Sequence, residues 1–368
     1  MAAAGAEVVS LQWRPFAMAL PRPLGTARGT LAERRGWLLR LSSSTGAVGW
    51  GEAAPLAFGE AGRARFDQTR AALEGLALLG EPILGAMGAC RAAPSSARLP
   101  IAQLEAVIAA QRCPADLAFA LGSALAEHTH QVGAGAGGWL PAPASAQLLP
   151  AGAAALDALE AALQSRQQHP QARPKAPEAN GPCFKWKVAV HPDAEERALL
   201  EHLLARLPAA ARLRLDANGQ WDRSTAAAWA DRLAGDERLQ WLEQPLAPTD
   251  HAGLEELARR LPVALDESLR EQPQLRQGWR GWQVRRPSQE GDPRPLLAEL
   301  AAGRPQLVLS TAFETGIGRR WLHHLAGLQA QGPTPAAPGL ALDWQPSGPL
   351  VSADPQQVWE AAAWARVS

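Results

Sequence analysis

The pattern of hydrophobic and polar positions divides the chain into two parts. Between residues 8 and 55, apolar residues alternate with polar ones and glycines interrupt them, as in VVSLQWRPFAMAL, GWLLRL and AVGWGEAAP. Such alternation is typical of strands with one buried face, so this stretch predicts a small antiparallel meander. Helical periodicity follows in the segments that begin at residues 63, 101 and 115. Together these elements predict an α+β domain over residues 1–130.

Beyond residue 146, short apolar segments alternate with helical ones. This alternation is the pattern of repeated βα units and a parallel sheet. We expect eight strands, at residues 146–149, 183–190, 212–218, 239–245, 263–268, 282–287, 306–311 and 340–344. Eight such units predict a closed barrel of the (β/α)8 type over residues 146–351.

Two segments interrupt this organisation. Residues 131–145 are rich in glycine and proline and include a GxGxxG spacing. A dinucleotide fingerprint requires a strand before it and a helix after it, whereas here a helix precedes and prolines follow, which favours a linker. Residues 164–182 are polar and proline-rich and predict a solvated insertion loop. The closing segment, residues 352–368, has a helical pattern and is expected to pack back on the first domain.

Charge and cysteine usage narrow the range of partners. Lys+Arg and Asp+Glu both number 36, so the chain has no global field that would attract nucleic acid or an anionic membrane. No apolar run reaches the roughly 20 residues needed to cross a bilayer, and the N-terminus lacks an export signal. The 3 cysteines are far apart, which fits a reducing compartment. We therefore expect a cytoplasmic protein with a small-molecule partner, as a monomer or small homo-oligomer.

Three consecutive predicted strands end in carboxylates: Asp216 in LRLDAN, Glu243 in WLEQP and Asp266 in ALDES. Catalytic groups of a barrel lie at the C-terminal ends of its strands, so these acids should meet at the mouth. Close carboxylates repel unless a cation neutralises them, and hard oxygen ligands suit Mg²⁺. For any one acid the alternative is a helix cap, but three at matching depth favour a metal site. Arg214 and Asn218 share the inward face with Asp216 and are candidates to orient ligands or substrate.

Lysine is scarce in this chain. It occurs only at Lys175, Lys185 and Lys187, so 36 − 3 = 33 of the basic residues are arginine. FKWKV places Lys185 and Lys187 on one strand face, toward the acids. A lysine beside another cation can have its pKa lowered from about 10.4, whereas arginine does not release its proton. The scarcity favours a proton-transfer role for at least one lysine, although Lys185 could serve only to neutralise the acids.

The motifs FKWKVAV, LRLDANGQW, WLEQPL, ALDESLR and STAFETGIG stand in order at βα spacing, with GWGEAAPL and FALGSALAE upstream. They resemble the enolase superfamily, in its muconate-lactonizing-type subgroup, and most closely the o-succinylbenzoate synthases. The resemblance covers nearly the whole chain apart from the two insertions. It implies an N-terminal α+β capping domain, a modified (β/α)7β barrel, and Mg²⁺ or, in its place, Mn²⁺.

The resemblance also implies roles for these residues. Lys187 would be the base that removes the α-proton of a carboxylate substrate, Asp216, Glu243 and Asp266 would be the metal ligands, and Lys185 would be a supporting charge. The implied reaction is the dehydration of 2-succinyl-6-hydroxy-2,4-cyclohexadiene-1-carboxylate to 2-succinylbenzoate through an enediolate, in menaquinone or phylloquinone biosynthesis.

Further residues match the substrate-binding parts of the family. Ser310 and Thr311 correspond to residues near the substrate carboxylate or succinyl group. Gly25, Thr26 and Arg28 fall in the capping-domain loop with which the family closes over its substrate.

The chain departs from the family at WQVRRPS, where Arg286 replaces a second lysine; Arg285 is adjacent, but Arg286 precedes Pro287 as the family lysine does. Arginine keeps the charge without acting as a base. Racemases need two exchangeable groups and the dehydration needs one base, so Arg286 favours dehydration. The alternatives are an N-succinylamino acid racemase or cycloisomerase of the same superfamily, and a non-catalytic barrel that serves as a binding module. His323 and His324 lie in a predicted helix, where packing or exposure is expected.

Overall fold

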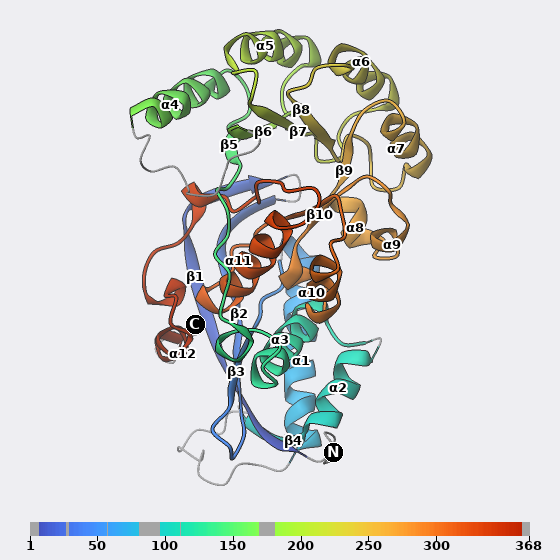
Figure 1. Ribbon diagram of the computed structural model, residues 1–368. Coiled ribbons are helices and arrows are strands. Elements are labelled where there is room, and N and C mark those ends of the chain that lie inside the picture. The colour runs from blue at the N-terminus through green and yellow to red at the C-terminus, as the bar shows by residue number, and fades with distance from the viewer. Residues whose placement is uncertain are drawn as a thin grey trace.

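The computed structural model describes residues 7–26, 29–56, 58–80, 96–110, 112–168 and 181–362. Figure 1 shows an elongated molecule, with a long antiparallel sheet and its helices toward one end and a curved parallel sheet ringed by helices toward the other. The predicted fold class, α/β with an N-terminal α+β layer, is confirmed. No helix in the described ranges is both long and apolar enough to cross a bilayer.

The antiparallel sheet has the strand order β3-β2-β1-β4. Its strands are β1 (Val8–Thr26), β2 (Gly29–Ser42), β3 (Val48–Ala53) and β4 (Ser96–Pro100). The predicted meander is therefore confirmed, and β4 joins it as a strand that the pattern of SARLP did not reveal. Alternate side chains of β1, such as Val9 and Leu11, have no exposed surface, as expected for a sheet with one covered face.

Three helices cover that face: α1 (Gly59–Leu79), α2 (Ile101–Ala109) and α3 (Ala115–His128). All three agree with the predicted helical segments. Helix α3 is buried almost throughout, because the antiparallel sheet packs on one part of its surface and the parallel sheet with its helices packs on another. Its Leu117 and Leu121 belong to the core of the antiparallel sheet, whereas Phe119 and Ala126 pack with residues of the second layer. This helix therefore joins the two layers.

Strand β3 approaches α3 very closely at two glycines. A Cβ atom on Gly49 would lie 1.9 Å from the carbonyl oxygen of Ala124, and one on Gly51 would lie 2.0 Å from that of Ala120. Backbone atoms cannot swing aside as a flexible side chain can, so any side chain here would force the two elements apart. The GWG sequence of β3 is therefore a packing requirement.

We expect a Gly51→Ala variant to lose about 3 kcal/mol of unfolding free energy, the upper end of the usual cost of overpacking. Gly75→Ala is the matched control, because nothing lies within 4 Å of a Cβ at this position of α1. In a helix, alanine is favoured over glycine by up to about 1 kcal/mol, so this control should be neutral or stabilising. Urea denaturation measures both changes, and equal stability of the two variants would contradict the close packing of β3 on α3.

The parallel sheet has the order β11-β10-β9-β8-β7-β6-β5. Its strands are β5 (Gln147–Leu149), β6 (Cys183–Lys187), β7 (Arg212–Asp216), β8 (Leu239–Glu243), β9 (Val263–Leu265), β10 (Trp282–Arg285) and β11 (Leu307–Leu309). Seven of the expected strands are therefore present, in sequence order. β5 ends at Leu149 as predicted, whereas the other six strands end earlier than predicted.

Helices connect these strands and pack on the outside of the sheet. They are α4 (Ala154–Gln168), α5 (Asp193–Arg206), α6 (Arg223–Leu233), α7 (His251–Ala258), α8 (Glu267–Glu271), α9 (Leu275–Gly278), α10 (Arg294–Ala301) and α11 (Gly316–Ala330). The main core lies between the parallel sheet and these helices. It contains buried leucines of α5 and tryptophans of both the sheet and the helices, such as Trp186 and Trp229.

The prediction of an eighth strand at residues 340–344 is wrong. Ala341 has a φ of 48°, in the left-handed region, and Leu342–Trp344 form a 3-10 helix, η4. The apolar alternation of LALDW resembles a strand, but the left-handed φ of Ala341 takes the backbone out of the extended conformation that a strand needs. Local pattern therefore suggested an element that the tertiary structure does not form.

A single bridge nevertheless stands in place of that strand. Gly339 pairs with Ser310 in parallel, and its N–H donates to the Leu309 carbonyl at 2.8 Å. On the other side, the Ala146 N–H donates to the Pro338 carbonyl at 2.9 Å. Residues 338–340 thus connect β11 to the segment that enters β5.

The two interrupting segments have different outcomes. Helix α4 extends to Gln168, so the first part of the predicted insertion loop, residues 164–168, is helical and the prediction is wrong there. Residues 169–180 lie outside the described residues. In the segment 131–145, a one-turn 3-10 helix, η1 (Ala134–Ala136), occupies the glycine-rich part and no strand precedes it. The domain boundaries at residues 130, 145 and 351 stay a prediction.

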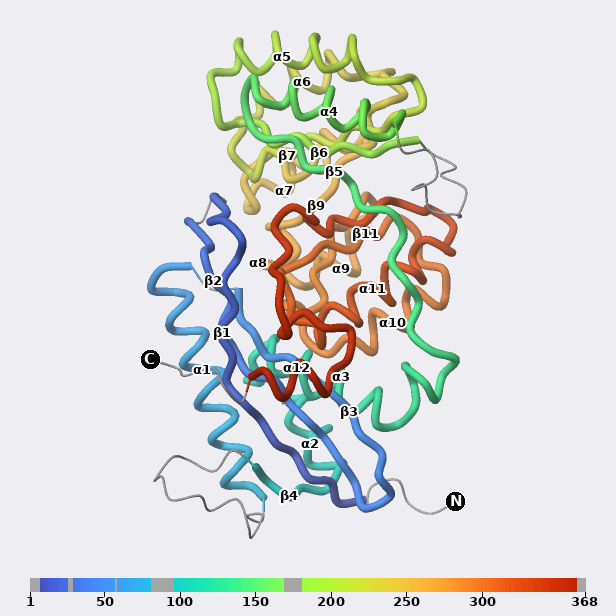
Figure 2. Tube along the Cα trace, turned by 90° about the vertical axis from the view of Figure 1, so that its left-hand side faces the viewer, coloured from blue at the N-terminus to red at the C-terminus, as the bar shows by residue number. Residues whose placement is uncertain are grey.

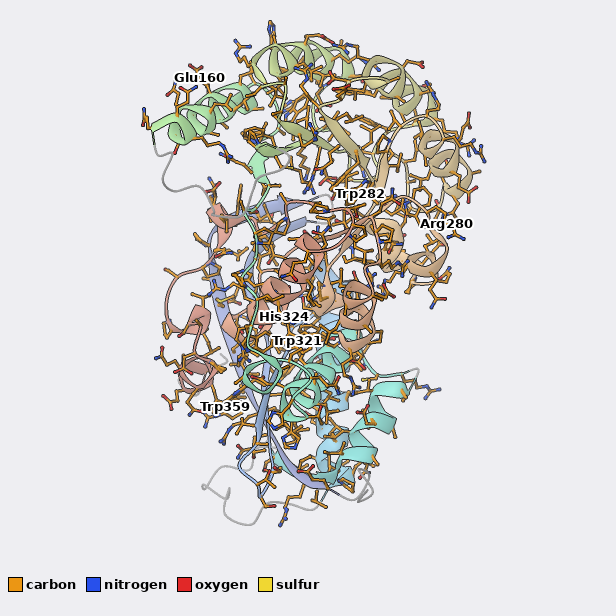
Figure 3. The ribbon with its side chains drawn as sticks, in the orientation of Figure 1. Glu160, Arg280, Trp282, Trp321, His324 and Trp359 are labelled. Carbon is orange, nitrogen blue, oxygen red and sulfur yellow. The ribbon has the colours of Figure 1, made fainter. Side chains whose placement is uncertain are left out.

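Helix α12 (Pro355–Ala362) lies against the antiparallel sheet (Figure 2). Its Val358 and Trp359 are buried with Phe16 and Trp50 of that sheet, and the rings of Trp50 and Trp359 lie 5.8 Å apart. Trp359 is labelled among the side chains of Figure 3. The last described helix therefore completes the core of the first layer.

Candidate active site

A cavity of about 560 Å³ lies where the parallel strands end, beneath the β1–β2 hairpin. One side of it is polar, with side chains from β6, from the end of β7 and from the residues after β7, β9, β10 and β11: Lys185, Lys187, Asp216, Asn218, Asp266, Glu267, Arg270, Arg286, Ser310 and Thr311. The other side is apolar and includes residues of the hairpin, of the segment after β3, of the loop after β11 and of η4: Leu24, Leu31, Leu56, Phe58, Phe313 and Trp344. The cavity thus combines charged groups with a wall that excludes water.

The three predicted carboxylates lie at neighbouring strand ends. Asp216 and Glu243 are register partners on β7 and β8, and Asp266 follows β9 directly. Their exposed fractions are 7%, 2% and 2%. Three buried carboxylates on adjacent strands need positive charge nearby, because burial penalises each ionised form.

Lys185 supplies that charge for two of them. Its Nζ lies 2.8 Å from Asp216 Oδ2 and 2.6 Å from Glu243 Oε1. Burial acts to lower the pKa of Lys185, but the charges of Asp216 and Glu243 outweigh it and hold this pKa above its usual range. Lys185 is therefore a fixed ammonium group in this arrangement.

Arg286 supplies the positive charge for the third carboxylate, that of Asp266. Its Nη2 and Nε donate to the two oxygens of Asp266 at 2.7 and 3.2 Å, and its Nη1 donates to the Thr311 carbonyl at 2.6 Å. Burial acts to raise the pKa of Asp266, but the charges of Arg286 and Arg270 outweigh it and hold this pKa well below its usual range. The adjacent Arg285 points elsewhere, to Glu290 at 2.7 Å. Arg286 is thus the arginine that faces the cavity, in the predicted register.

Glu267 and Arg270, for which the sequence suggested no role in the site, also line the cavity. Their side chains pair at 3.1 Å. Burial and the charges of Asp266 and Asp216 raise the pKa of Glu267 to about 8. Three acids therefore line the polar side, and Glu243 lies next to them, paired with Lys185.

Lys187 differs from the other cations of the cavity. It is the register partner of Asp216 on the adjacent strand β7, and it lies two residues after Lys185 on β6. Within the described part of the chain, its ammonium group has no hydrogen-bond or ion-pair partner. An unpaired amine in a half-closed cavity is free to contact a ligand.

The remaining predicted substrate contacts are only partly brought together. Ser310, Thr311 and Asn218 line the cavity. Arg214 does not: it is 2% exposed, donates to Gln240 at 2.8 Å, and its guanidinium lies 4.0 Å from the Trp241 ring centroid. Because side chains alternate along a strand, Arg214 points to the same face of β7 as Asp216, as predicted, but it lies two residues earlier in the strand and so below the floor of the cavity.

The predicted lid residues belong to the turn of the β1–β2 hairpin. Gly25 lines the cavity, and Thr26 ends β1, where its backbone pairs with Gly29. Arg28 lies outside the described residues. Leu24 and Leu31 of the same hairpin pack with Phe313. The hairpin therefore forms part of the roof.

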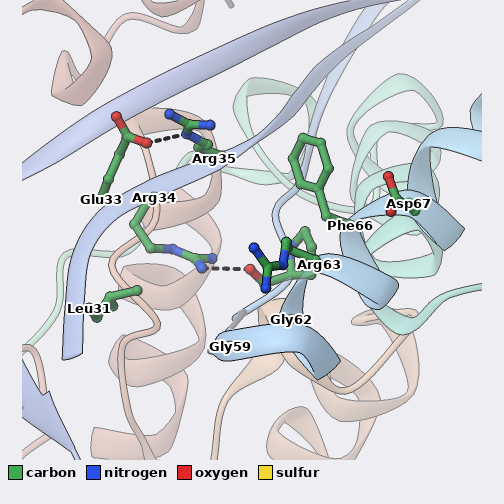
Figure 4. Close-up of a pocket in the computed structure, with 10 residues that line it drawn as sticks. Leu31, Glu33, Arg34, Arg35, Gly59, Gly62, Arg63, Phe66 and Asp67 are labelled. Atoms are coloured by element: carbon green, nitrogen blue, oxygen red, sulfur yellow. Dashed lines mark hydrogen bonds and ion pairs between the residues drawn. The ribbon is translucent and has the colours of Figure 1, made fainter. Parts of the chain in front are cut away.

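A second cavity of about 290 Å³ lies between β2 and α1 and shares Leu31 with the first (Figure 4). Its Arg34 is 1% exposed and donates to the carbonyls of Ala54 and Pro55 at 2.6 and 2.8 Å. Arg35 pairs with Glu33. These cations are used within the protein, and the candidate acids and bases lie in the larger cavity.

The two histidines of α11 lie away from the cavity. His324, next to Trp321 in Figure 3, accepts a hydrogen bond from the Leu140 N–H at 3.1 Å and lies 5.5 Å from the Trp139 ring. Neither His323 nor His324 lines the cavity, and burial lowers the pKa of both. They serve in packing.

Sequence reasoning missed a buried group that supports Thr311. Glu314, in the FETG motif, accepts hydrogen bonds from Thr311 Oγ1 at 2.7 Å, Ser288 Oγ at 2.6 Å and the Ala312 N–H at 3.0 Å. It fixes the loop after β11 from below. The motif contained this residue, but only the fold shows which hydroxyls it holds.

Glu52 of β3 reaches the same region from the first layer. Its Oε2 accepts hydrogen bonds from Thr315 N at 2.9 Å, Thr315 Oγ1 at 2.6 Å and Gly318 N at 3.1 Å, at the start of α11. Burial raises the pKa of Glu52 to about 7, although the Thr315 hydrogen bond acts to lower it. A titratable group therefore joins the two layers.

The pKa of Glu52 predicts a pH dependence of stability. Because its folded pKa, about 7, exceeds the reference value of 4.5, the folded protein holds a proton that the unfolded chain releases. This contribution is complete below pH 4.5 and is lost as the pH rises through 7. Relative to a Glu52→Gln variant, the wild-type unfolding free energy should fall by about 1.4 kcal/mol per pH unit in that window. Parallel urea-denaturation profiles for both proteins would contradict it.

Asp216, Glu243 and Asp266 are the candidate ligands of a metal ion. Among the described residues, no three His, Cys, Asp or Glu side chains stand as a ready metal-binding group. Lys185 and Arg286 contact the oxygens of Asp216, Glu243 and Asp266 instead. The donor set itself, three buried carboxylates at adjacent strand ends, has the hard oxygen chemistry that Mg²⁺ prefers. The residues present therefore fit a magnesium ion.

Comparison with known proteins gives one family. Residues 171–280 match the family described as enolase C-terminal domain-like. Over 180 residues the chain is 42% identical to the o-succinylbenzoate synthase of Thermosynechococcus vestitus, an alignment that covers 46% of this chain and 55% of that protein. The chain thus spans about half the length of that curated relative.

Solved structures extend the likeness over the whole chain. The o-succinylbenzoate synthase of Thermosynechococcus elongatus BP-1, complexed with Mg in its active site, superposes with a TM-score of 0.69 at 30% identity, covering 95% of this chain and 99% of that one. The L-Ala-D/L-Glu epimerase of Bacillus subtilis gives 0.60 at 20% identity, with 88% of each chain covered, which shows a shared fold.

Proposed function

The chain belongs to the enolase superfamily, and we propose that within it the protein acts as an o-succinylbenzoate synthase. It would convert 2-succinyl-6-hydroxy-2,4-cyclohexadiene-1-carboxylate into 2-succinylbenzoate and water. The support is a likeness along nearly the full chain to one such synthase and the geometry of the cavity.

One observation carries the proposal: the cavity is lined by one amine without a partner among the described residues and by a guanidinium that is fixed in place. Lys187 has no partner among the described side chains, whereas Arg286 is held by Asp266 and by the Thr311 carbonyl. Proton exchange on two faces of a carbon needs two groups that titrate, and arginine does not. Lys187 and Arg286 together therefore suit a reaction that needs only one base, such as this dehydration.

The chemistry assigned to each residue follows from its contacts. Lys187 Nζ takes the α-proton as the C–H bond breaks, then returns it to the departing hydroxyl as the C–O bond breaks, so that water leaves and the ring becomes aromatic. Mg²⁺ held by Asp216, Glu243 and Asp266 would supply positive charge to the substrate carboxylate. Arg286 adds a fixed positive charge beside it.

The charge at the polar side suits a substrate with two carboxylates. The cations are Lys185, Lys187, Arg270 and Arg286, and the acids are Asp216, Glu243, Asp266 and Glu267. Lys187 is uncharged when it accepts a proton, and Glu267, with its pKa raised to about 8, holds a proton at neutral pH, so 3 cations and 3 anions remain, 3 − 3 = 0, and a bound divalent cation would leave a charge of +2. The proposed substrate, a dianion, would neutralise it.

Several finer properties belong to the same proposal. Mn²⁺ would replace Mg²⁺, the product would enter menaquinone or phylloquinone biosynthesis, and the enzyme would work in the cytoplasm as a monomer or small homo-oligomer. Ser310, Thr311, Asn218 and Gly25 would contact the substrate.

The test is the dehydration assay on purified protein. Product should form with MgCl₂ present and not after EDTA treatment. Absence of dehydration in both conditions, with N-succinylamino acids exchanging their α-proton for solvent deuterium and inverting, would establish the racemase instead. Absence of both activities and of Mg²⁺ binding would favour a non-catalytic binding module.

An Arg286→Lys variant tests the one-base account. We expect it to keep dehydration and to gain α-proton exchange on N-succinylamino acids, because a second amine would then face the substrate. Proton NMR in deuterated water measures the exchange. Equal exchange by the wild type would contradict the role given to the arginine.

A further inference from the structure

Gln244 occupies an unusual position between two of the proposed metal ligands. It directly follows Glu243, is 0% exposed, and has a φ of 38°, in the left-handed region that glutamine rarely adopts. A strained residue persists only where its surroundings fix it. Its backbone N–H donates to Ala264 O at 2.8 Å and its carbonyl accepts from Gly219 N at 2.7 Å, so it already joins three strand ends.

The side chain of Gln244 continues this connection. Its Oε1 accepts from the N–H groups of Asp266 at 3.2 Å and Ser268 at 3.1 Å. Its Nε2 donates to Ser268 Oγ at 2.8 Å and to the Leu246 carbonyl at 2.9 Å. Two N–H donors and one carbonyl acceptor leave only one orientation for the carboxamide, which therefore uses all of its main hydrogen-bonding positions.

These contacts change what Asp266 does. Asp266 is the N-cap residue of α8, and an aspartate in that position normally turns its carboxylate back to accept the free N–H groups of the first turn. Here it makes no such capping bond. Gln244 Oε1 takes the Ser268 N–H in its place, and the Asp266 carboxylate points to Arg286 at the cavity instead.

We propose that Gln244 is a positioning residue whose carboxamide caps α8 in place of Asp266, and so keeps the Asp266 carboxylate available as a metal ligand. The inference rests on the proposed function, because it concerns the same three carboxylates. Without the carboxamide, the Ser268 N–H would lack an acceptor in a buried place, and Asp266, as the N-cap residue of α8, is the carboxylate whose position in the chain suits it to supply one.

The experiment measures Mg²⁺ binding rather than turnover. Full-length, metal-free protein is titrated with MgCl₂ by calorimetry, as wild type and as Gln244→Met, which keeps the side-chain length and removes its polar atoms. Residues that orient metal ligands typically change metal affinity about 10- to 100-fold, and we expect the dissociation constant of the variant to rise by that factor. A crystal structure of the variant should show the Asp266 carboxylate turned to the Ser268 N–H.

Gln283→Met is the matched control. Gln283 is also a buried glutamine, 2% exposed, whose Nε2 donates to the carbonyls of Arg276 at 3.0 Å and Trp279 at 3.4 Å, but it does not line the cavity. Both variants should lose stability, because both leave buried backbone groups unpaired. Only Gln244→Met should change Mg²⁺ affinity.

The outcomes separate the two ideas. Wild-type protein that binds no Mg²⁺ would overturn both the proposed function and the role of Gln244. Wild-type binding with the same dissociation constant in Gln244→Met, or an equal loss in Gln283→Met, would overturn only the role of Gln244. Should Gln244→Met fail to fold, Ser268→Ala decides, since it removes the hydroxyl that orients Nε2; unchanged affinity there would overturn the proposal.

Discussion

A Lys187→Ala variant is expected to lose about 10²- to 10⁴-fold in kcat for the proposed dehydration, the usual contribution of a general acid or base. Lys187 is the one cavity cation without a partner among the described residues. Its amine can therefore approach a substrate carbon, whereas the Lys185 ammonium is held between two carboxylates at 2.6 and 2.8 Å. Steady-state assays at saturating Mg²⁺ measure the loss.

Lys187→Arg separates proton transfer from charge. Arginine restores the positive charge but not a group that accepts a proton at neutral pH, so it should be as inactive as the alanine variant. Both variants should bind Mg²⁺ as the wild type does, because Lys187 makes no contact with the three carboxylates. Recovery of activity in Lys187→Arg would mean that the residue acts by its charge alone.

Lys185→Met is expected to lower the unfolding free energy by about 3–5 kcal/mol in the presence of EDTA, as does removal of one partner from a buried ion pair. Asp216 and Glu243 would remain buried without the ammonium group that bridges them. Mg²⁺ should recover part of the loss, since a ligand that binds only the folded state adds about 2.7 kcal/mol at 100 times its Kd.

The control for this effect is Arg197→Met. Arg197 pairs with Asp193 at 2.7 Å, but both side chains are substantially exposed, and an exposed pair contributes about 1 kcal/mol or less. Thermal and urea denaturation with EDTA and with MgCl₂ give the comparison. Lys185→Met with wild-type stability in EDTA would show that the two carboxylates do not depend on the bridge.

The strands of the parallel sheet could be predicted because each is a short apolar run bounded by polar turns. Their ends could not: after β6, the Val188 N–H still donates to the Asp216 carbonyl at 2.9 Å, but Ala189 has a φ of 62° and turns the chain out of the sheet, and nothing in the apolar character of residues 188–190 signals it. The eighth strand failed for the opposite reason. LALDW alternates as a strand does, yet Ala341 in the left-handed region and η4 end any ladder after Gly339.

The site shows a similar division. The order of motifs along the chain predicted three acids at strand ends and two lysines on one face. The structure brings Lys185, Lys187, Asp216 and Asp266 to one cavity wall, whereas Glu243 does not line the cavity and reaches it only through Lys185. The contacts of Glu52 with Thr315, 263 residues apart, could not be predicted, because no local pattern relates two such positions. Arg214 shows that a shared face does not fix depth: it lies below the floor.

The packing of α12 on the antiparallel sheet has a consequence for protein synthesis. Phe16 and Trp50 are made early, whereas their partners Val358 and Trp359 leave the ribosome about 300 residues later. At about 5–20 residues per second, that delay is on the order of 15–60 s. Throughout it, an apolar face of the nascent sheet stays uncovered. Folding of this chain should therefore depend on chaperones that bind nascent polypeptides, and messages truncated before codon 355 should yield aggregates.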